Sequence, residues 1–127
     1  MNRAIQITYF LLRIVAGLLF ACHGAQKLFG FLGAERATGA FMTLAGVIEF
    51  FGGLFVALGL FASIAAFICS GQMAVAYFKA HAPGGFWPIQ NHGELAMIYC
   101  FLFFYIAARG PGMWSLGRGR RGRPAAP

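Results

Sequence analysis

Long apolar runs, separated by short segments that contain glycine or proline, dominate the chain. Four of them have the length and hydropathy of membrane helices, namely Thr8–Leu28, Thr43–Gly59, Ala62–Tyr77 and Glu94–Ala108. A helix needs about 17–25 residues to span hydrocarbon, and the last two runs fall slightly short of that length. The pattern predicts an all-α membrane fold: a four-helix transmembrane bundle over residues 1–116, followed by a disordered basic tail over residues 117–127.

The positions of lysine and arginine indicate how these helices are oriented. With four spans, both termini lie on one side, together with Arg3 and the five arginines that follow residue 108. The opposite side holds Lys27, Arg36 and Lys79. The positive-inside rule then predicts that both termini are cytoplasmic and that loops 30–42 and 78–93 face outward. We expect a multi-pass protein of the bacterial inner (plasma) membrane.

The composition agrees with this assignment and excludes other classes. The chain is 60% hydrophobic and 10% charged, whereas soluble domains are about 25% charged. The net charge of +7 comes largely from the C-terminal arginines, so we expect contact with anionic lipid and no nucleic-acid partner. Cys22, Cys69 and Cys100 lie in three different apolar runs without a C-x-x-C pair, and we expect free, buried thiols.

Small residues predict close contacts between helices. Gly46 and Gly53 flank Glu49 on the second predicted helix. The third predicted helix carries a ridge of small residues at four-residue spacing, namely Ala62, Ala66, Ser70 and Ala74. Such ridges allow membrane helices to approach one another closely.

Polar side chains gather at one depth of the predicted bundle. Alternating helix directions bring six of them toward the outer half of the membrane: His23, Lys27, Glu49, Gln72, His92 and Glu94. Buried charges are costly unless they pair inside the bundle. We therefore expect Glu49 and Glu94 to meet His23 and Lys27. Two interpretations stay open, a structural network that fixes helix register and a ligand-binding, redox or proton site that opens outward.

Arg13 lies apart from this cluster, near the predicted cytoplasmic end of the first helix. We expect a structural role, with the guanidinium reaching lipid phosphates or Tyr105.

Metal and haem binding are disfavoured. Four side chains of the cluster are of metal-binding types, namely His23, His92, Glu49 and Glu94. However, Lys27 lies one helical turn from His23 and disfavours a second cation there. Haem ligation is disfavoured because His81 and His92 fall in predicted loops. We predict no metal site.

Several short motifs occur in order between about residues 6 and 116. They are HGAQKLFG (23–30), preceded by Arg13 and Gly17; AGVIEFFGG (45–53), followed by LGL (58–60); GFWPIQNHGE (85–94); and GPGMWSL (110–116). Together they resemble the DoxX family of small four-helix membrane proteins. Ser63 departs from the family pattern, which often has arginine there, and so does Gly117, where an acidic residue often follows. Both positions lie on the predicted cytoplasmic side, so these departures bear on partners at that side and not on the polar cluster.

The resemblance implies a function, because the family is named after a membrane subunit associated with archaeal quinol oxidase and thiosulfate:quinone oxidoreductase. We expect a component of a quinone-linked redox system of the thiosulfate or thiol type, with quinone as ligand and either a redox partner subunit or a homo-oligomer. Whether the chain is itself an oxidoreductase stays open, because it carries no flavin motif.

Two other functions remain as alternatives. In the first, the protein is a non-enzymatic membrane scaffold or assembly subunit, in which the polar network is structural and the ridge on the third helix docks a partner. A small proton-coupled carrier is a weaker alternative, since four helices without an inverted repeat make alternating access difficult.

Overall fold

The computed structural model describes residues 2–31, 33, 35–36 and 38–117. Within these residues the chain is helical and has no strand, which confirms the predicted all-α class. The long helices are α1 (Arg3–Phe29), α2 (Ala40–Leu58), α3 (Ala62–Ala76) and α5 (Glu94–Arg109). Between α3 and α5 lie the π-helical η1 (Tyr77–His81), the 3₁₀ turn η2 (Ala82–Gly84) and α4 (Pro88–Asn91). Among the described helices, α1 and α2 are long and apolar enough to cross a membrane.

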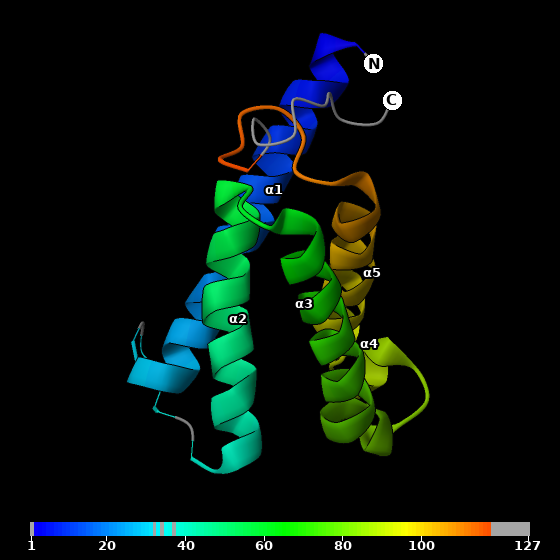
Figure 1. Ribbon diagram of the computed structural model, residues 1–127. Helices are drawn as coiled ribbons and strands as arrows, with labels where there is room; N and C mark the ends of the chain where they lie inside the picture. Colours follow the sequence, from blue (N-terminus) through cyan, green and yellow to red (C-terminus); the bar gives the residue numbers. More distant parts are fainter. Residues whose placement is uncertain (1, 32, 34, 37, 118–127) are drawn as a thin grey trace.

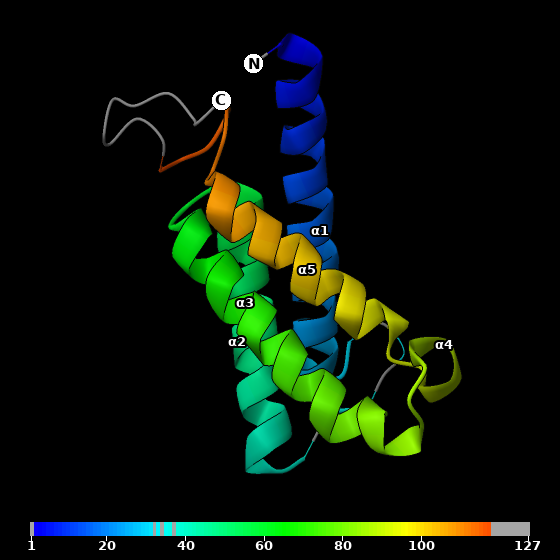
Figure 2. The ribbon, with the colours of Figure 1, turned by 90° about the vertical axis from the view of Figure 1, so that its right-hand side faces the viewer.

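The helices pack in the order α1 on α2, α2 on α3, and α3 on α5 (Figure 1). The start of α1, the turn between α2 and α3, and the end of α5 lie at one end of the molecule, which we call the terminal end. The α1–α2 connection and the segment 77–93 lie at the opposite end, which we call the loop end. Figure 2 shows that α5 runs obliquely to α1.

The helices α1 and α2 begin earlier than predicted. The Asn2 side chain accepts a hydrogen bond from the backbone N–H of Ile5 at 2.9 Å and caps α1, which begins at Arg3, five residues before Thr8. Helix α2 begins at Ala40 and not at Thr43. Both helices end at a glycine in the left-handed conformation, Gly30 (φ 71°) and Gly59 (φ 74°). Hydropathy located the apolar centre of each helix, whereas hydrogen bonds set its ends.

The segment predicted as loop 78–93 is folded around the side chain of Asn91, which is 6% exposed. The Asn91 amide nitrogen donates to the Tyr77 hydroxyl at 3.0 Å and to the Gly85 carbonyl at 2.9 Å. Its amide oxygen accepts from the N–H of Gly93 at 2.8 Å. This one side chain therefore ties the end of α3 to the start of α5, and helical turns replace the predicted loop.

An aromatic cluster joins the first and last helices. The ring of Phe20 on α1 lies 5.0 Å from Tyr99 and 4.7 Å from Phe103, both on α5, measured between centroids. Ala66 of the α3 ridge is fully buried in the same core, and Ser70 donates to the Cys100 carbonyl at 2.7 Å. The ridge packs against α5 of the same chain, in agreement with the predicted close contact between helices.

Arg13 is a structural residue, as expected, but its partners differ from the predicted ones. Its side chain is 1% exposed, so it does not reach lipid phosphates. The guanidinium instead donates to backbone carbonyls at the terminal end, namely those of Ala57, Pro111, Met113 and Trp114. Tyr105 instead makes an edge contact with Tyr9. Arg13 thus fastens the segment 110–117 to the end of α2.

Arg13→Met is expected to release this segment. The N–H groups of Leu116 and Gly117 donate to Leu58 and Gly59 at 3.0 and 3.1 Å, and their hydrogen exchange should accelerate about tenfold or more. A hydrogen bond to a charged group contributes about 1.5–3 kcal/mol, so losing even one accounts for that change. Exchange measured by mass spectrometry checks it. Arg3→Met is the matched control because Arg3 only lies over the Trp114 ring; exchange unchanged in Arg13→Met would contradict the assignment.

The three cysteines are free, but only Cys69 is buried. Cys22 is exposed, so the prediction of buried thiols is wrong for it, because residue 22 lies on the outward face of α1. The predicted basic tail lies outside the described residues, apart from Gly117.

Candidate functional site: a polar triad beside an apolar groove

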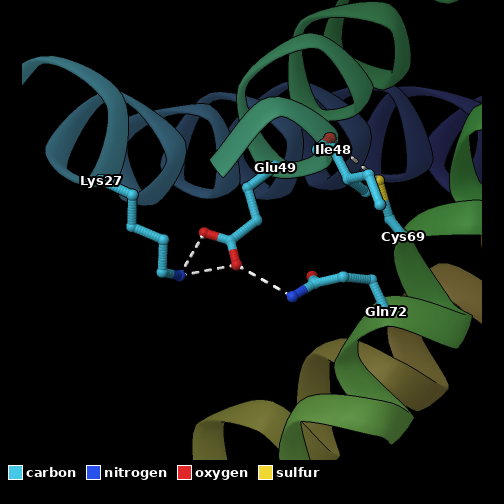
Figure 3. Close-up of polar contacts among 5 residues, drawn as sticks. All are labelled: Lys27, Ile48, Glu49, Cys69 and Gln72. Carbon is cyan, nitrogen blue, oxygen red and sulfur yellow. Dashed lines mark hydrogen bonds and ion pairs between the residues drawn. The ribbon is translucent and has the colours of Figure 1, made fainter. Parts of the chain in front are cut away.

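Three polar side chains from three helices meet in the interior, and we call them the polar triad: Lys27 of α1, Glu49 of α2 and Gln72 of α3 (Figure 3). The Lys27 ammonium lies 2.6 Å from each carboxylate oxygen of Glu49. The Gln72 amide nitrogen donates to Oε2 of the same carboxylate at 3.2 Å. Glu49 is 1% exposed and the Lys27 side chain 25%.

Glycines bring α1 and α2 close enough for this pairing. A Cβ atom added at Gly24 would lie 2.7 Å from the Gly46 carbonyl oxygen and from the Phe50 Cα. One added at Gly46 would lie 3.0 Å from the Lys27 Cβ. Because the two backbones touch here, the Lys27 side chain emerges directly beside α2. The ammonium therefore reaches the Glu49 carboxylate one turn farther along.

The triad is electrically balanced. An ammonium and a carboxylate in direct contact neutralise each other, and the Gln72 amide adds a dipole without net charge. Breaking such a pair in a low-dielectric interior is costly, because the remaining ion has no water to solvate it. The arrangement therefore makes an ionised carboxylate tolerable deep in the molecule.

Glu49 lies deeper than predicted. It is nine residues from each end of α2, and hence about 14 Å from each end at 1.5 Å of rise per residue. The sequence placed it in the outer half because the hydropathy window missed Ala40–Met42, the first three residues of α2. Gln72 is also central, since α3 continues without a break into η1. The carboxylate of the triad thus sits near mid-depth of α2.

An apolar groove of about 290 Å³ lies between α2 and α3, next to the triad. Leu44 and Ile48 of α2 face Ile68 and Gly71 of α3 across it, and Gln72 contributes to its lining. The Gln72 amide oxygen is buried and accepts no hydrogen bond from the described residues. The lining of the groove itself is therefore almost entirely apolar.

The other predicted site residues do not join the triad. His23 is half-buried on α1, and its ring packs edge-on against Tyr99 with centroids 6.1 Å apart. His92 and Glu94 are exposed at the loop end. The expected pairing of Glu94 with His23 or Lys27 is wrong: His92 adopts φ 63°, and the turn that it forms starts α5 with Glu94 directed outward. Helix direction predicted the depth of Glu94 but not the side that it faces.

The sequence did not reveal two features of this region. The groove is lined in part by Gly71, whose added Cβ would meet no atom within 4 Å, and a single glycine in an apolar run is a weak signal. The sequence also did not predict that the loop end folds around Asn91, although this residue lies in the motif GFWPIQNHGE. Within the part of the chain that the structure describes, no three metal-binding side chains cluster.

Comparisons with known proteins agree with the motifs. The DoxX family model matches residues 8–82, which include all three members of the triad. A Haemophilus influenzae protein, described as uncharacterized, is 46% identical over 118 residues, covering 85% of this chain and 88% of that protein. No solved structure matches the chain.

Proposed function

The chain belongs to the DoxX family of membrane proteins, and from that premise we propose that it is a component of a quinone-linked redox system. Its reductant is thiosulfate or a thiol, and it lies in the bacterial inner membrane with both termini cytoplasmic. Four spans are supported by α1 and α2, by the continuous run of α3 into η1, and by the 16 apolar-rich residues of α5. The excess of arginine near the two ends of the sequence supports the orientation.

The polar triad beside the apolar groove is the observation that carries this proposal. A lipid-soluble substrate enters from the hydrocarbon, so its site needs an apolar wall and a few polar groups at depth. The groove between α2 and α3 supplies the wall, and Gln72 supplies an amide at its edge. Glu49 is the carboxylate that lies next to Gln72, and Lys27 holds it in place.

The chemistry balances with a small reductant. Two thiols that form a disulfide release two electrons and two protons, and a quinone that becomes a hydroquinone takes up both. With thiosulfate, two ions form tetrathionate and release two electrons, while the protons come from solvent. The triad residues bind, orient and manage protons in this scheme. Electrons arrive directly from the bound reductant or from a partner subunit.

The test is quinone reduction by the purified protein in lipid nanodiscs. We expect a short-chain quinone with thiosulfate or a thiol to be reduced faster than in empty nanodiscs, followed by quinone absorbance. Gln72→Leu should slow this reaction about tenfold, as expected for the loss of one hydrogen bond in the transition state. Ile64→Phe, an exposed change on α3 outside the groove, is the matched control. Absence of quinone binding would refute the proposal.

A scaffold or assembly role is the second candidate, favoured by one observation. Both Glu49 oxygens are already occupied by Lys27 and Gln72, as in a network that only fixes helix packing. In that case, mild-detergent pull-down should return one stoichiometric partner, and Glu49→Gln should abolish the complex or the fold. No quinone would be retained by the purified protein.

A further inference from the structure

We propose that the groove between α2 and α3 binds an anionic phospholipid of the leaflet at the loop end, the predicted outer side. The lipid phosphate lies at Lys79, and one acyl chain lies along the groove. Three features of this region support such a site: a cation at the mouth of the groove, the shape of the groove and its extent along the helices. The site is on the opposite side of the membrane from the C-terminal arginines.

A lysine lies at the mouth of the groove. Phe41, in the first turn of α2, lines the groove, and the Lys79 ammonium of η1 lies over its ring, 4.9 Å from the ring centroid. Lys79 is exposed, and no carboxylate of the described residues lies within ion-pair distance of it. The ring holds the ammonium in place but supplies no hydrogen-bond acceptor, so an anion can bind to the ammonium at the same time.

The location of this lysine is unusual for a membrane protein. Lys79 lies on the predicted outer side, where lysine and arginine are normally depleted. Trp87, in the same loop-end segment, is exposed, as is typical of aromatic residues at the level of lipid headgroups. Lys79 therefore lies at the height at which phospholipids carry their phosphate groups, and attraction to anionic lipid gives a reason for a cation there.

The groove forms because α2 and α3 diverge toward the loop end (Figure 1). Midway along α3 the two helices touch, since a Cβ atom added at Gly52 would lie 2.5 Å from the Cys69 Sγ. One added at Gly71, nearer the loop end, would meet no atom within 4 Å. The side chains of Leu44 and Ile68 line the groove and are exposed. The groove is therefore open to the hydrocarbon of the membrane.

The extent of the groove matches an acyl chain in one leaflet. Along α3 it runs from Phe67 to Val75, which is about 12 Å at 1.5 Å of rise per residue. The hydrocarbon of one leaflet is about 15 Å thick, half of the ~30 Å core of a bilayer. Val75 comes four residues before Lys79, so the groove and the cation follow each other along one side of the helix.

An anionic phospholipid fits these features better than other occupants do. A quinone has no anionic group for Lys79. A helix of a second copy is about 10 Å across and needs far more space than the groove volume of about 290 Å³. An inorganic anion binds to an ammonium but leaves the apolar groove unfilled. A phospholipid supplies both the anion and the apolar chain.

The experiment measures which lipid occupies the groove, by quenching of a tryptophan placed in it. Phe67→Trp puts this reporter at an exposed groove position, and subtracting the parent protein's fluorescence removes the signal of the native tryptophans. The nanodiscs contain phosphatidylglycerol and phosphatidylcholine with identical chains, brominated on one lipid at a time. We expect phosphatidylglycerol to bind at the groove about fivefold more tightly, which corresponds to the about 1 kcal/mol of one lysine near anionic lipid.

Three further substitutions in the reporter protein test the assigned residues. Lys79→Gln should remove the preference for phosphatidylglycerol, and Gly71→Leu, which fills the groove, should reduce quenching by both lipids. Arg3→Gln is the matched control and should keep the fivefold preference, because Arg3 lies at the terminal end over the Trp114 ring.

Four results would overturn the proposal. They are equal quenching by the two lipids in the reporter protein, a preference that survives in Lys79→Gln, unaltered quenching in Gly71→Leu, and loss of the preference when glycerol phosphate is added in excess at constant ionic strength. The last result would identify a site for free anions and not for a lipid.

The lipid site goes beyond the proposed function and does not rest on it. A quinone that enters the same groove has to displace the acyl chain. If phosphatidylglycerol is preferred at the groove but no quinone is reduced, the lipid site is established and the redox function fails. If quinone is reduced and both lipids quench the reporter equally, the redox function stands and the lipid proposal fails.

Discussion

Glu49→Leu is expected to destabilise the protein by about 3–5 kcal/mol, because it leaves the Lys27 ammonium without its counter-ion in the interior. The carboxylate is 1% exposed and lies 2.6 Å from the ammonium, whose own side chain is 25% exposed, so little solvent is available to replace the lost counter-ion. The free energy of unfolding is measured by titration with a denaturing detergent and followed by helical circular dichroism. A fall of less than 1 kcal/mol would show that the pair contributes little.

The double variant Lys27→Met with Glu49→Leu is the control for this prediction. Replacing both ions with apolar groups removes the stranded charge, and such replacements are often neutral or stabilising. We expect the double variant to recover most of the lost stability. If it is as unstable as Glu49→Leu alone, packing and not charge explains the loss. The stability of Glu49→Gln should lie between that of Glu49→Leu and that of the double variant, because its amide still bonds to Gln72 but carries no negative charge.

Gly24→Val is expected to separate α1 from α2. A Cβ at this position would lie 2.7 Å from the Gly46 carbonyl oxygen and the Phe50 Cα, which are backbone atoms that cannot rotate away. Overpacking typically costs about 1–3 kcal/mol, and a backbone clash places this variant at or above that upper value. The shift would also lengthen the Lys27–Glu49 contact. Detergent unfolding measures the first effect, and non-additivity with Glu49→Leu measures the second.

Gly71→Ala is the matched control, since it makes the same kind of change where the added atom meets open space. It should be neutral or stabilise by about 0.5–1 kcal/mol, because alanine favours the helix. Equal destabilisation by the two substitutions would indicate a general intolerance of helix changes and contradict the specific contact between α1 and α2. Gly24→Val with unaltered stability would contradict it as well.

Some features of the site followed directly from residue spacing. The convergence of Lys27 and Glu49 was predictable because two opposite charges in neighbouring apolar segments must pair to be tolerated. The structural role of Arg13 was predictable from its place near the predicted cytoplasmic end of the first helix, apart from the polar cluster. Its partners were not, because they are backbone carbonyls, which every residue has and which leave no trace in a sequence. The predicted pairing of Glu94 was wrong because the turn at His92 decides which way α5 begins.

The sequence by itself determined the helical class, the membrane environment and the family, because composition, apolar run length and short motifs are local properties of the chain. Only the tertiary structure decided that Gln72 and not Glu94 completes the polar triad. It also decided that α5 covers the small-residue ridge and that a groove remains between α2 and α3. These features depend on the relative rotation and spacing of packed helices, which are set by contacts between residues far apart in the chain.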